Sequence, residues 1–428
     1  MCTGPRNWAG ARMADRQGAG ADHPGAAPAH DPGRVPLRLE LAIYGAATFS
    51  NSLGYMVMVA VPLLLVSLGL SPLWMGIVLG SRHLLVLFYS IHAGAMMDRL
   101  DTRRVMLMFA WMSIVLPFAY PLLPYVLPLI LIQMAAGYCT SIGWIGAQAL
   151  IGQALKGSPV HTGRMGAVIR IGALTGPPLT GAAWDLYGPW ACFAVLALWG
   201  VGLLASCLAL PDRARGGPKP RVTLADFVPR ADDYRAAFSL LAIPLVATVI
   251  MVALLRISSF SIQASFYVVW LDGQGYTGTL IGVLLGAYSL FGGGAALATG
   301  TLVKRFSAVW MMIAMVAVTI AAVTVTPALG STWALFAVVS INGAAYGLTQ
   351  PLMIILMSRG SGAEHQGKAV ALRTSANRLA ATLIPPAMGA IAEIAGLEAS
   401  FYIVGATVLA LLAGAAVFAH KVGAAKEA

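Results

Sequence analysis

The sequence is poor in charged residues. Only 10% of its 428 residues are Asp, Glu, Lys or Arg, and 59% are hydrophobic. An average soluble domain carries roughly 25% charged residues. Because so few charges cannot cover a surface that faces water, the composition excludes an ordinary soluble protein. It predicts a chain whose surface is largely in contact with lipid.

Signals for metals, nucleotides and catalysis are also missing. The four cysteines, Cys2, Cys139, Cys192 and Cys207, show neither metal-ligand spacing nor a paired framework, which favours simple packing roles. No phosphate-binding Gly-x-x-x-x-Gly-Lys-Ser/Thr loop occurs. A membrane enzyme needs His, Asp, Glu or Cys clustered at one depth, and no such cluster is visible. We therefore expect no metal, no cofactor, no ATP hydrolysis and no enzymatic activity.

Long apolar runs fill most of the chain. A helix needs ~20 apolar residues to cross the ~30 Å core of a bilayer, and runs this long must be helical to satisfy their backbone groups in lipid. The expected spans lie near 39–68, 73–96, 105–122, 125–150, 165–187, 190–210, 237–270, 278–301, 308–328, 332–357, 368–394 and 398–420. The fold class is thus an all-α polytopic membrane protein with about twelve transmembrane helices.

The basic residues predict the orientation. Lys and Arg gather in alternate connecting segments, whereas the loops 69–72, 188–189, 271–277 and 329–331 contain neither. Since positive loops stay in the cytoplasm, both termini are expected there, in the cell (inner) membrane. The net charge of +11 then follows from topology, and no nucleic acid is expected as a partner.

The two halves of the sequence repeat each other. Residues 76–80 return as 282–286 at an offset of 206; at an offset of 208, Pro177-Pro178 returns as Pro385-Pro386 and Asp185 as Glu393. Such duplication is typical of secondary transporters with a central solute site. The expected division is a disordered cytoplasmic tail at 1–36, an N-terminal six-helix bundle at 37–210, a cytoplasmic linker at 211–236, a pseudo-symmetric C-terminal six-helix bundle at 237–421 and a cytoplasmic tail at 422–428.

One loop resembles a family signature. The segment Gly94-Ala-Met-Met-Asp98-Arg99-Leu-Asp101-Thr-Arg103-Arg104 resembles the loop after the second span of the major facilitator superfamily (MFS), with Asp101-Thr102 in place of the usual glycine region. The stretch Gly172-x-x-x-Gly176-Pro177 resembles a degraded glycine-proline motif of the same family. The resemblance covers roughly 38–420. It implies the MFS fold, a monomer, and rocker-switch alternating access for a small-molecule substrate.

The resemblance and the helix physics together suggest gating residues. A carboxylate at Asp98 can meet a helix N-terminus or an arginine and latch one conformation. Prolines remove backbone donors, and the paired prolines are expected to interrupt two helices. Basic residues near the loop also suit lipid phosphates, so membrane lipids are expected partners. The gating candidates are Gly94, Asp98, Arg99, Arg103, Arg104, Arg170, Arg378, Gly176, Pro177 and Pro385.

Arginines lie inside the predicted spans without acids at the same depth. A charge at the bilayer centre costs ~2.5–3.5 kcal/mol on insertion scales, so each must face a cavity or a partner. Arginine pairs with anions in bidentate geometry, which favours an anionic solute. The substrate-binding candidates are Arg82, Arg256, Asn51, Gln263, Asn342 and Tyr346. Histidine titrates near neutral pH; the proton-coupling candidates are His83, His92, Asp185 and Glu393.

Several functions remain open on the sequence. The leading hypothesis is a secondary active transporter of a small solute, with an organic or inorganic anion favoured, coupled to a proton or counter-solute. The alternative is an antiporter that exports multiple drugs or other lipophilic compounds; such antiporters commonly carry a membrane-embedded acid in the first half, and none is present at depth here. A non-transporting membrane receptor and a membrane enzyme are weaker hypotheses.

Overall fold

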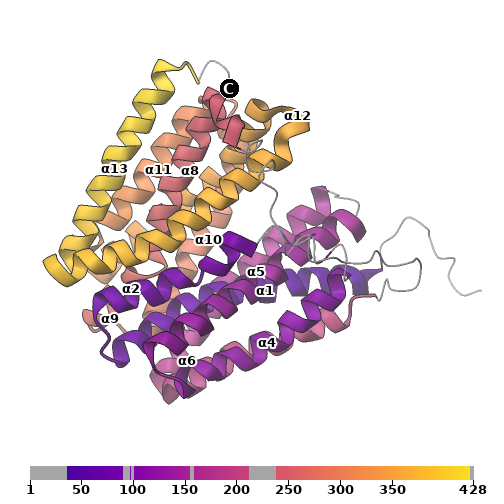
Figure 1. Ribbon diagram of the computed structural model, residues 1–428, viewed down its shortest axis with the longest axis vertical. Helices are drawn as coiled ribbons and strands as arrows, with labels where there is room; N and C mark the ends of the chain where they lie inside the picture. Colours follow the sequence, from indigo (N-terminus) through magenta and orange to yellow (C-terminus); the bar gives the residue numbers. More distant parts are fainter. Residues whose placement is uncertain (1–35, 90–96, 98–100, 155–158, 212–237, 425–428) are drawn as a thin grey trace, which may run out of the picture. The chain divides into compact units, whose positions relative to one another are not determined.

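The computed structural model describes residues 36–89, 97, 101–154, 159–211 and 238–424, with the side chains of 152–160, 162, 361–368, 370 and 371 left out (Figure 1). Apart from their end residues Pro36 and Pro211, the predicted N-terminal tail and inter-bundle linker lie outside these ranges. Every regular element in the described part of the chain is a helix. The residues from Leu37 onward form one compact unit.

The first half of the chain contains five labelled helices. They are α1 (Leu37–Ser67), α2 (Pro72–Ser81), α4 (Thr102–Leu122), α5 (Val126–Ala154) and α6 (Pro159–Leu208). The second half contains η2 (Ser239–Ala242), α8 (Pro244–Gln263), α9 (Phe266–Gly273), α10 (Gly278–Leu302), α11 (Ala308–Thr324), η3 (Thr326–Ala328), α12 (Thr332–Ala395) and α13 (Leu397–Lys421).

Nine helices among the described residues are long and apolar enough to cross a membrane, and α11 is a shorter apolar helix. Two helices are longer than one crossing requires. With a rise of 1.5 Å per residue, the 50 residues of α6 and the 64 of α12 run to ~75 and ~96 Å, against a bilayer core of ~30 Å. Each therefore combines two of the expected spans. The predicted gap between 357 and 368 is helical, which corrects that boundary.

Glycines turn the chain at matched places in the two halves. Gly188 leaves helical geometry inside α6 with φ of 77°, and its repeat partner Gly396 separates α12 from α13 with φ of 90°. Gly69 and Gly275, which are 206 residues apart, have φ values of 63° and 81°. Only glycine adopts such values freely. The repeat seen in the sequence is therefore also present in the backbone.

The paired prolines do not interrupt their helices, contrary to the sequence prediction. Pro177, Pro178, Pro385 and Pro386 lie inside α6 and α12. The α-helical hydrogen-bonding pattern is interrupted instead at the turn of Arg82 and His83 and at residues 264–265 between α8 and α9. Neighbouring helices can satisfy the backbone groups that a proline frees, so a proline need not end a membrane helix.

The carbonyls freed by these prolines face glycines on another helix. Pro386 leaves the carbonyl of Thr382 without its helical donor, and a Cβ on Gly80 of α2 would lie 2.5 Å from that oxygen. Pro178 frees the carbonyl of Leu174, which would lie 2.9 Å from a Cβ on Gly286 of α10. Glycine hydrogens therefore point at both oxygens, in the manner of weak Cα–H···O contacts.

Further glycine–carbonyl contacts occur at matched positions between α2 and α12 and between α10 and α6. A Cβ on Gly76 would overlap the carbonyl of Pro385, and one on Gly282 would overlap the carbonyl of Pro177. Gly282 is the repeat of Gly76, and Pro385 is the repeat of Pro177. The packing of α2 on α12 is thus the pseudo-symmetric copy of the packing of α10 on α6. Small residues permit this close approach of membrane helices.

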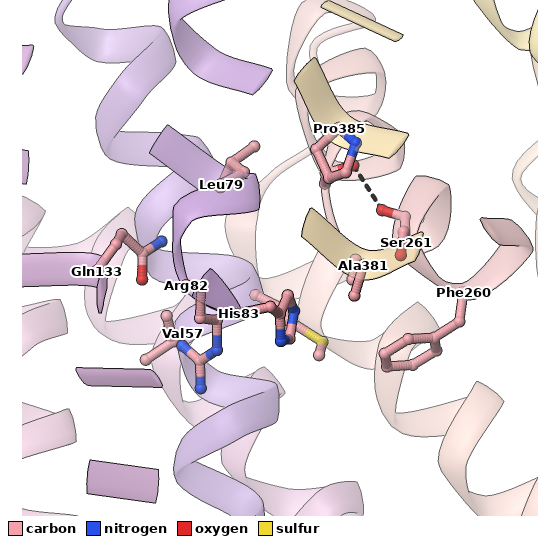
Figure 2. A pocket seen from close by; sticks show the side chains of 12 residues that line it. Val57, Leu79, Arg82, His83, Gln133, Phe260, Ser261, Ala381 and Pro385 are labelled. Carbon is pink, nitrogen blue, oxygen red and sulfur yellow. Dashed lines mark hydrogen bonds between the residues drawn. The ribbon is translucent and has the colours of Figure 1, made fainter. Parts of the chain in front are cut away.

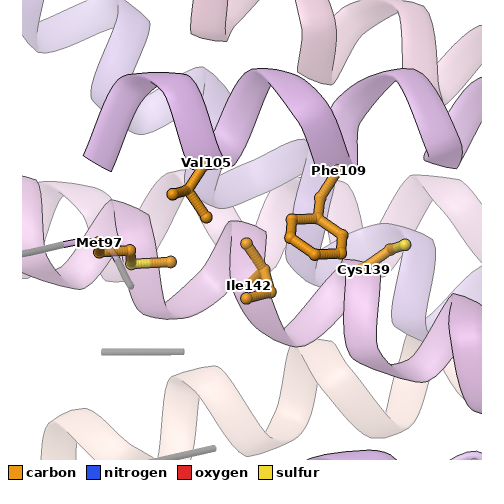
Figure 3. Packing of buried hydrophobic residues seen from close by; sticks show 5 residues of the cluster. All are labelled: Met97, Val105, Phe109, Cys139 and Ile142. Carbon is orange, nitrogen blue, oxygen red and sulfur yellow. The ribbon is translucent and has the colours of Figure 1, made fainter. Parts of the chain in front are cut away.

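A hydrophobic cluster packs α4 against α5 beside the family-like loop. It comprises Met97, Val105, Phe109, Cys139 and Ile142 (Figure 3). Cys139, Cys192 and Cys207 are buried free thiols, in agreement with the packing roles expected for them.

Candidate functional site

A cavity of about 180 Å³ lies where α1, α2, α5, α8 and α12 meet. Its basic lining residues are Arg82, His83 and Arg378, and Phe260 closes one side. Polar and aromatic side chains complete the wall: Ser50, Asn51, Tyr55, Thr140, Ser141 and Trp144. A smaller cavity of about 30 Å³ adjoins it and shares Arg82, His83 and Phe260 (Figure 2). Of the arginines expected in the spans, Arg82 and Arg378 therefore line a cavity, whereas Arg170 and Arg256 do not.

Arg82 is positioned by two glycines. It occupies the turn at which α2 ends, and a Cβ on Gly137 of α5 would overlap its backbone carbonyl. A Cβ on Gly54 of α1 would lie 3.7 Å from Nη2. The residue is 8% exposed, and its guanidinium donates from Nη2 to Thr140 Oγ1 at 3.2 Å. Its buried Nη1 finds no partner among the described residues.

Arg378 reaches the same cavity from α12. Its Nη1 lies 3.2 Å from Nδ1 of His83. A guanidinium has only donors, so the imidazole nitrogen must accept this bond, and a neutral His83 then carries its proton on Nε2. Two arginines and one histidine are thereby gathered at one wall.

Arg256 and Arg373 form a second pair on α8 and α12. Arg256 donates from Nη2 to Gln350 Oε1 at 3.1 Å, and its guanidinium carbon lies 4.2 Å from the ring centroid of Tyr346. Arg373 donates from Nη1 to the same Gln350 oxygen at 3.5 Å. The ring of Tyr346 stacks on Phe260 at 5.3 Å. An aromatic stack thus stands between this pair and the cavity.

These basic groups lack acidic partners in the described part of the chain. The ion pairs formed between two described residues both involve Glu40, far along the sequence from either arginine pair. The nitrogens of Arg256 and Arg373 that share one oxygen lie within about 7 Å of each other, a repulsion of roughly 2 kcal/mol at an effective dielectric constant of about 20. No acidic side chain among the described residues therefore neutralises either arginine pair.

The other substrate candidates fall at two places. Asn51 lines the cavity, and Tyr346 carries the cation–π contact with Arg256. Gln263 and Asn342 instead hydrogen-bond each other at 3.0 Å, where α8 packs on α12. That contact is the helix–helix kind that polar residues commonly make in membranes.

Of the gating and proton candidates, Gly94, Asp98, Arg99 and His92 lie outside the described residues. Arg103 donates to the carbonyl of Leu208 at 3.3 Å, and Arg104 is exposed. A Cβ on Gly293 of α10 would lie 3.1 Å from Cδ of Arg170. A Cβ on Gly176 would lie 2.9 Å from Cγ of Met56.

The two helix-end acids cap helices of the opposite half. Asp185 accepts from the backbone N–H of Gly278 at 2.8 Å, from that of Thr279 at 2.7 Å and from the Thr279 hydroxyl at 2.6 Å. Glu393 accepts from the N–H of Leu73 at 3.2 Å. Both carboxylates therefore sit at helix N-termini, α10 and α2, where orphan donors and the helix dipole favour an anion.

Sequence reasoning missed several residues of the site. Arg373 is not among the residues predicted from the sequence, although it lies in the same helix as Arg378. Tyr55, Thr140 and Phe260 gave no distinguishing signal, because a hydroxyl or ring in a membrane helix is common.

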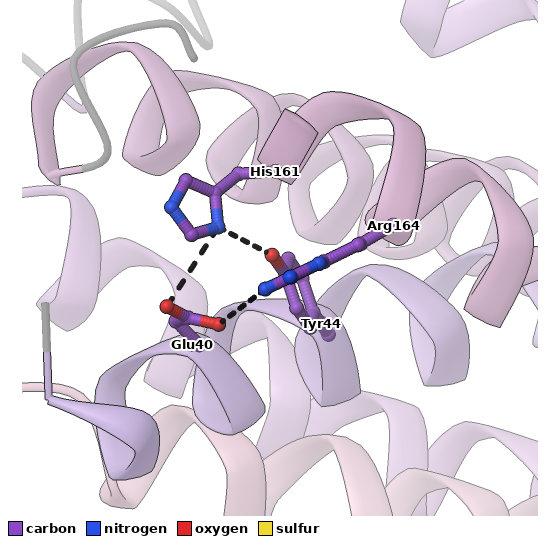
Figure 4. Close-up of polar contacts among 4 residues, drawn as sticks. All are labelled: Glu40, Tyr44, His161 and Arg164. Atoms are coloured by element: carbon purple, nitrogen blue, oxygen red, sulfur yellow. Dashed lines mark hydrogen bonds and ion pairs between the residues drawn. The ribbon is translucent and has the colours of Figure 1, made fainter. Parts of the chain in front are cut away.

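A polar cluster near the starts of α1 and α6 was also not predicted (Figure 4). There Tyr44 Oη lies 2.8 Å from His161 Nδ1, and Glu40 lies 3.7 Å from both His161 and Arg164.

Comparisons with known proteins identify the fold. The family model for the Major Facilitator Superfamily matches residues 43–271 and 249–427. A crystal structure of a mutant of the nucleoside transporter NupG superposes with a TM-score of 0.74 at 13% identity, covering 89% of this chain and 99% of that one. A bacterial homologue of the human lysosomal transporter Spinster, in an inward-facing and unoccupied conformation, gives 0.67 at 15% identity, covering 92% and 98%. No curated protein matches the sequence.

At these identities the structural matches speak for the fold alone, whereas the family model covers nearly all of both halves. The expected MFS fold is confirmed, and so is the expectation that the protein is not an enzyme. This chain belongs to the major facilitator superfamily: it is an all-helical, multi-pass membrane protein and a secondary transporter with a small-molecule substrate.

Proposed function

We propose that this transporter carries a small anion, organic or inorganic, by alternating access. The observation that carries the proposal is the basic wall of the cavity. Arg82, Arg378 and His83 meet there, and no carboxylate is among the cavity's lining residues in the described part of the chain. An anion supplies the counter-charge that these buried groups otherwise lack.

The donors at this wall suit an oxyanion. Arg82 has an unused, buried Nη1, and a buried donor without a partner is costly. Its planar guanidinium can engage a carboxylate or phosphate through two parallel hydrogen bonds. Asn51 and Ser141 add polar groups elsewhere in the wall. The arrangement supports recognition of one charged end of the solute.

The dimensions favour a small solute with an apolar body. A volume of about 180 Å³ lies below the ~300–1,000 Å³ of typical pockets for drug-sized ligands. Tyr55, Trp144 and Phe260 provide aromatic surface beside the basic wall. A compact organic acid satisfies both features. A drug-sized cation satisfies neither, which places lipophilic-compound export second.

The helix packing supports the transport cycle. Two pseudo-symmetric helix pairs, α2 with α12 and α6 with α10, join the two halves of the chain, and alternating access requires each pair to open and close. We place both termini in the cytoplasm of a cell (inner) membrane and assign the halves to residues 37–210 and 237–421, working as a monomer. Coupling to a proton or counter-solute would involve His83, which is in contact with Arg378 at the cavity wall.

A ligand screen with a transport assay tests the proposal. Purified protein is heated with benzoate, inorganic phosphate, a nucleoside or tetraphenylphosphonium, and uptake of the stabilising compound is measured in proteoliposomes. We expect an anion to raise the melting temperature, because ligands stabilise the state they bind. Arg82→Gln should reduce this shift and cut uptake at least tenfold.

The matched control is Arg305→Gln, which removes an exposed arginine after α10. It should leave both the shift and uptake unchanged. Stabilisation by the cation or the nucleoside, with no response to either anion, would replace the anion proposal with one of those solutes.

A further inference from the structure

Arg256 and Arg373 share one acceptor and are both buried. The two residues are 3% and 8% exposed, and each donates to Oε1 of Gln350. Thr349 Oγ1, 3.5 Å from Arg256 Nη1, already donates its own proton to the carbonyl of Tyr346 at 2.6 Å. The neutral groups around the pair therefore offer hydrogen bonds without offering negative charge.

Both arginines also have unused donors. The Nε of Arg256 and the Nε of Arg373 are buried and find no hydrogen-bond partner among the described residues. Most buried polar atoms in proteins do have a partner, so an unmet one requires an explanation. Two unmet N–H groups on neighbouring guanidiniums suggest a ligand that accepts from both.

A purely structural role for Arg256 and Arg373 does not account for their burial side by side. The cation–π contact with Tyr346 would stabilise one arginine in its place, but it does not neutralise a second cation within about 7 Å. Buried like charges persist in proteins when a counter-charge joins them. Gln350 is exposed, so an ion from outside the protein core can reach the pair.

The pair lies next to the cavity without being part of its lining. Phe260 lines the cavity and stacks on Tyr346, whose ring lies against Arg256. We propose that Arg256, Arg373 and Gln350 form a second anion subsite, separated from the cavity by the Phe260–Tyr346 stack. An oxyanion, carboxylate or phosphate, occupies it on the way between the cavity and one side of the membrane. This inference rests on the proposed function.

Binding stoichiometry tests the inference. Isothermal titration of the purified protein with benzoate and, separately, with inorganic phosphate at constant ionic strength should give two sites for at least one of these anions. Arg373→Gln should leave one site whose affinity is within threefold of the stronger wild-type site, and should reduce uptake at least tenfold. A single wild-type site, together with normal uptake by Arg373→Gln, would overturn the second subsite.

A second variant guards against misfolding. Gln350→Glu places a carboxylate between the two guanidiniums with little change of shape. It should raise the melting temperature by ~2 °C or more, because it supplies the missing counter-charge, and it should remove one anion site. Asn342→Asp is the matched control on the same helix, since its partner is the neutral Gln263; it should be destabilised and keep both sites.

The results separate the two proposals. If wild-type protein binds no anion and transports none, the proposed function fails. If Arg82→Gln loses anion binding and transport while Arg373→Gln and Gln350→Glu behave as wild type, only the second subsite fails.

Discussion

At the scale of single residues, the cavity depends on positions where any side chain would be too large. Gly137 is one of them, because its hydrogen occupies the space beside the Arg82 carbonyl. Its repeat partner Gly343 contacts the carbonyl of Tyr288, which is the repeat partner of Arg82. The glycine–carbonyl contact thus occurs in both halves, but the residue whose carbonyl is contacted is Arg82 in the first half and Tyr288 in the second.

We expect Gly137→Ala to displace Arg82 even though no charge changes. The added methyl group would overlap backbone, which cannot rotate away as a flexible side chain can. Anion affinity in the thermal-shift assay should fall at least tenfold. Gly163→Ala, where a Cβ meets nothing within 4 Å, should leave affinity unchanged. Equal affinity in the two variants would show that the turn at Arg82 is not held by α5.

At the scale of helices, the two acid caps are copies of unequal strength. Asp185 accepts three hydrogen bonds at the start of α10, whereas Glu393 accepts one, at 3.2 Å, at the start of α2. A negative charge at a helix N-terminus contributes about 0.3–1 kcal/mol when exposed and up to ~2 kcal/mol when partly buried. The pairing of α6 with α10 should therefore be the firmer of the two.

Asp185→Asn should lower the melting temperature more than Glu393→Gln does, because it weakens more charge-assisted bonds. If the caps hold this end of the helix pairs closed, Asp185→Asn should also increase hydrogen exchange at the start of α10. Anion affinity should change little, since neither acid lines the cavity. A larger loss of stability in Glu393→Gln would contradict the ranking of the caps.

At the scale of the whole molecule, the sequence predicted the architecture well and the site in part. Apolar run lengths and the repeat led to the correct fold, because they are direct consequences of a bilayer and of duplication, whereas the orientation inferred from the loop charges stays a prediction. Arg82, Asn51, His83 and Arg378 do share a cavity. Gln263 and Asn342 carry the same kind of signal yet bond each other, since depth in a helix does not reveal which face a side chain occupies.

The breaks in the helices were harder to predict. Prolines suggested interruptions in α6 and α12, but the α-helical hydrogen-bonding pattern is interrupted next to Arg82 and after Gln263, where no proline occurs. We attribute the continuity of α6 and α12 to their partner helices, whose glycines lie against the carbonyls that the prolines free. The pairing of a freed carbonyl on one helix with a glycine on a distant helix cannot be recognised from the sequence of either helix alone.

Gly282→Leu tests the transport cycle as a whole. A bulky side chain against the carbonyl of Pro177 should force α10 away from α6 and hold the molecule in one orientation. Anion binding should survive while uptake falls at least tenfold. Gly294→Leu, on the same helix with open space around it, should transport normally. Normal uptake by Gly282→Leu would mean that this contact does not need to close.

The glycine–carbonyl contacts have a further consequence for how often the two halves can separate. Interlocking side chains lose rotamer freedom each time they engage, at a cost of up to ~2 kcal/mol for a long side chain. Backbone meeting backbone has no rotamers to lose. The contacts from Gly76 to Pro385 and from Gly282 to Pro177 can therefore open and re-form with little entropic penalty. Such backbone contacts allow the two halves to pack closely and still separate repeatedly at a low cost in conformational entropy.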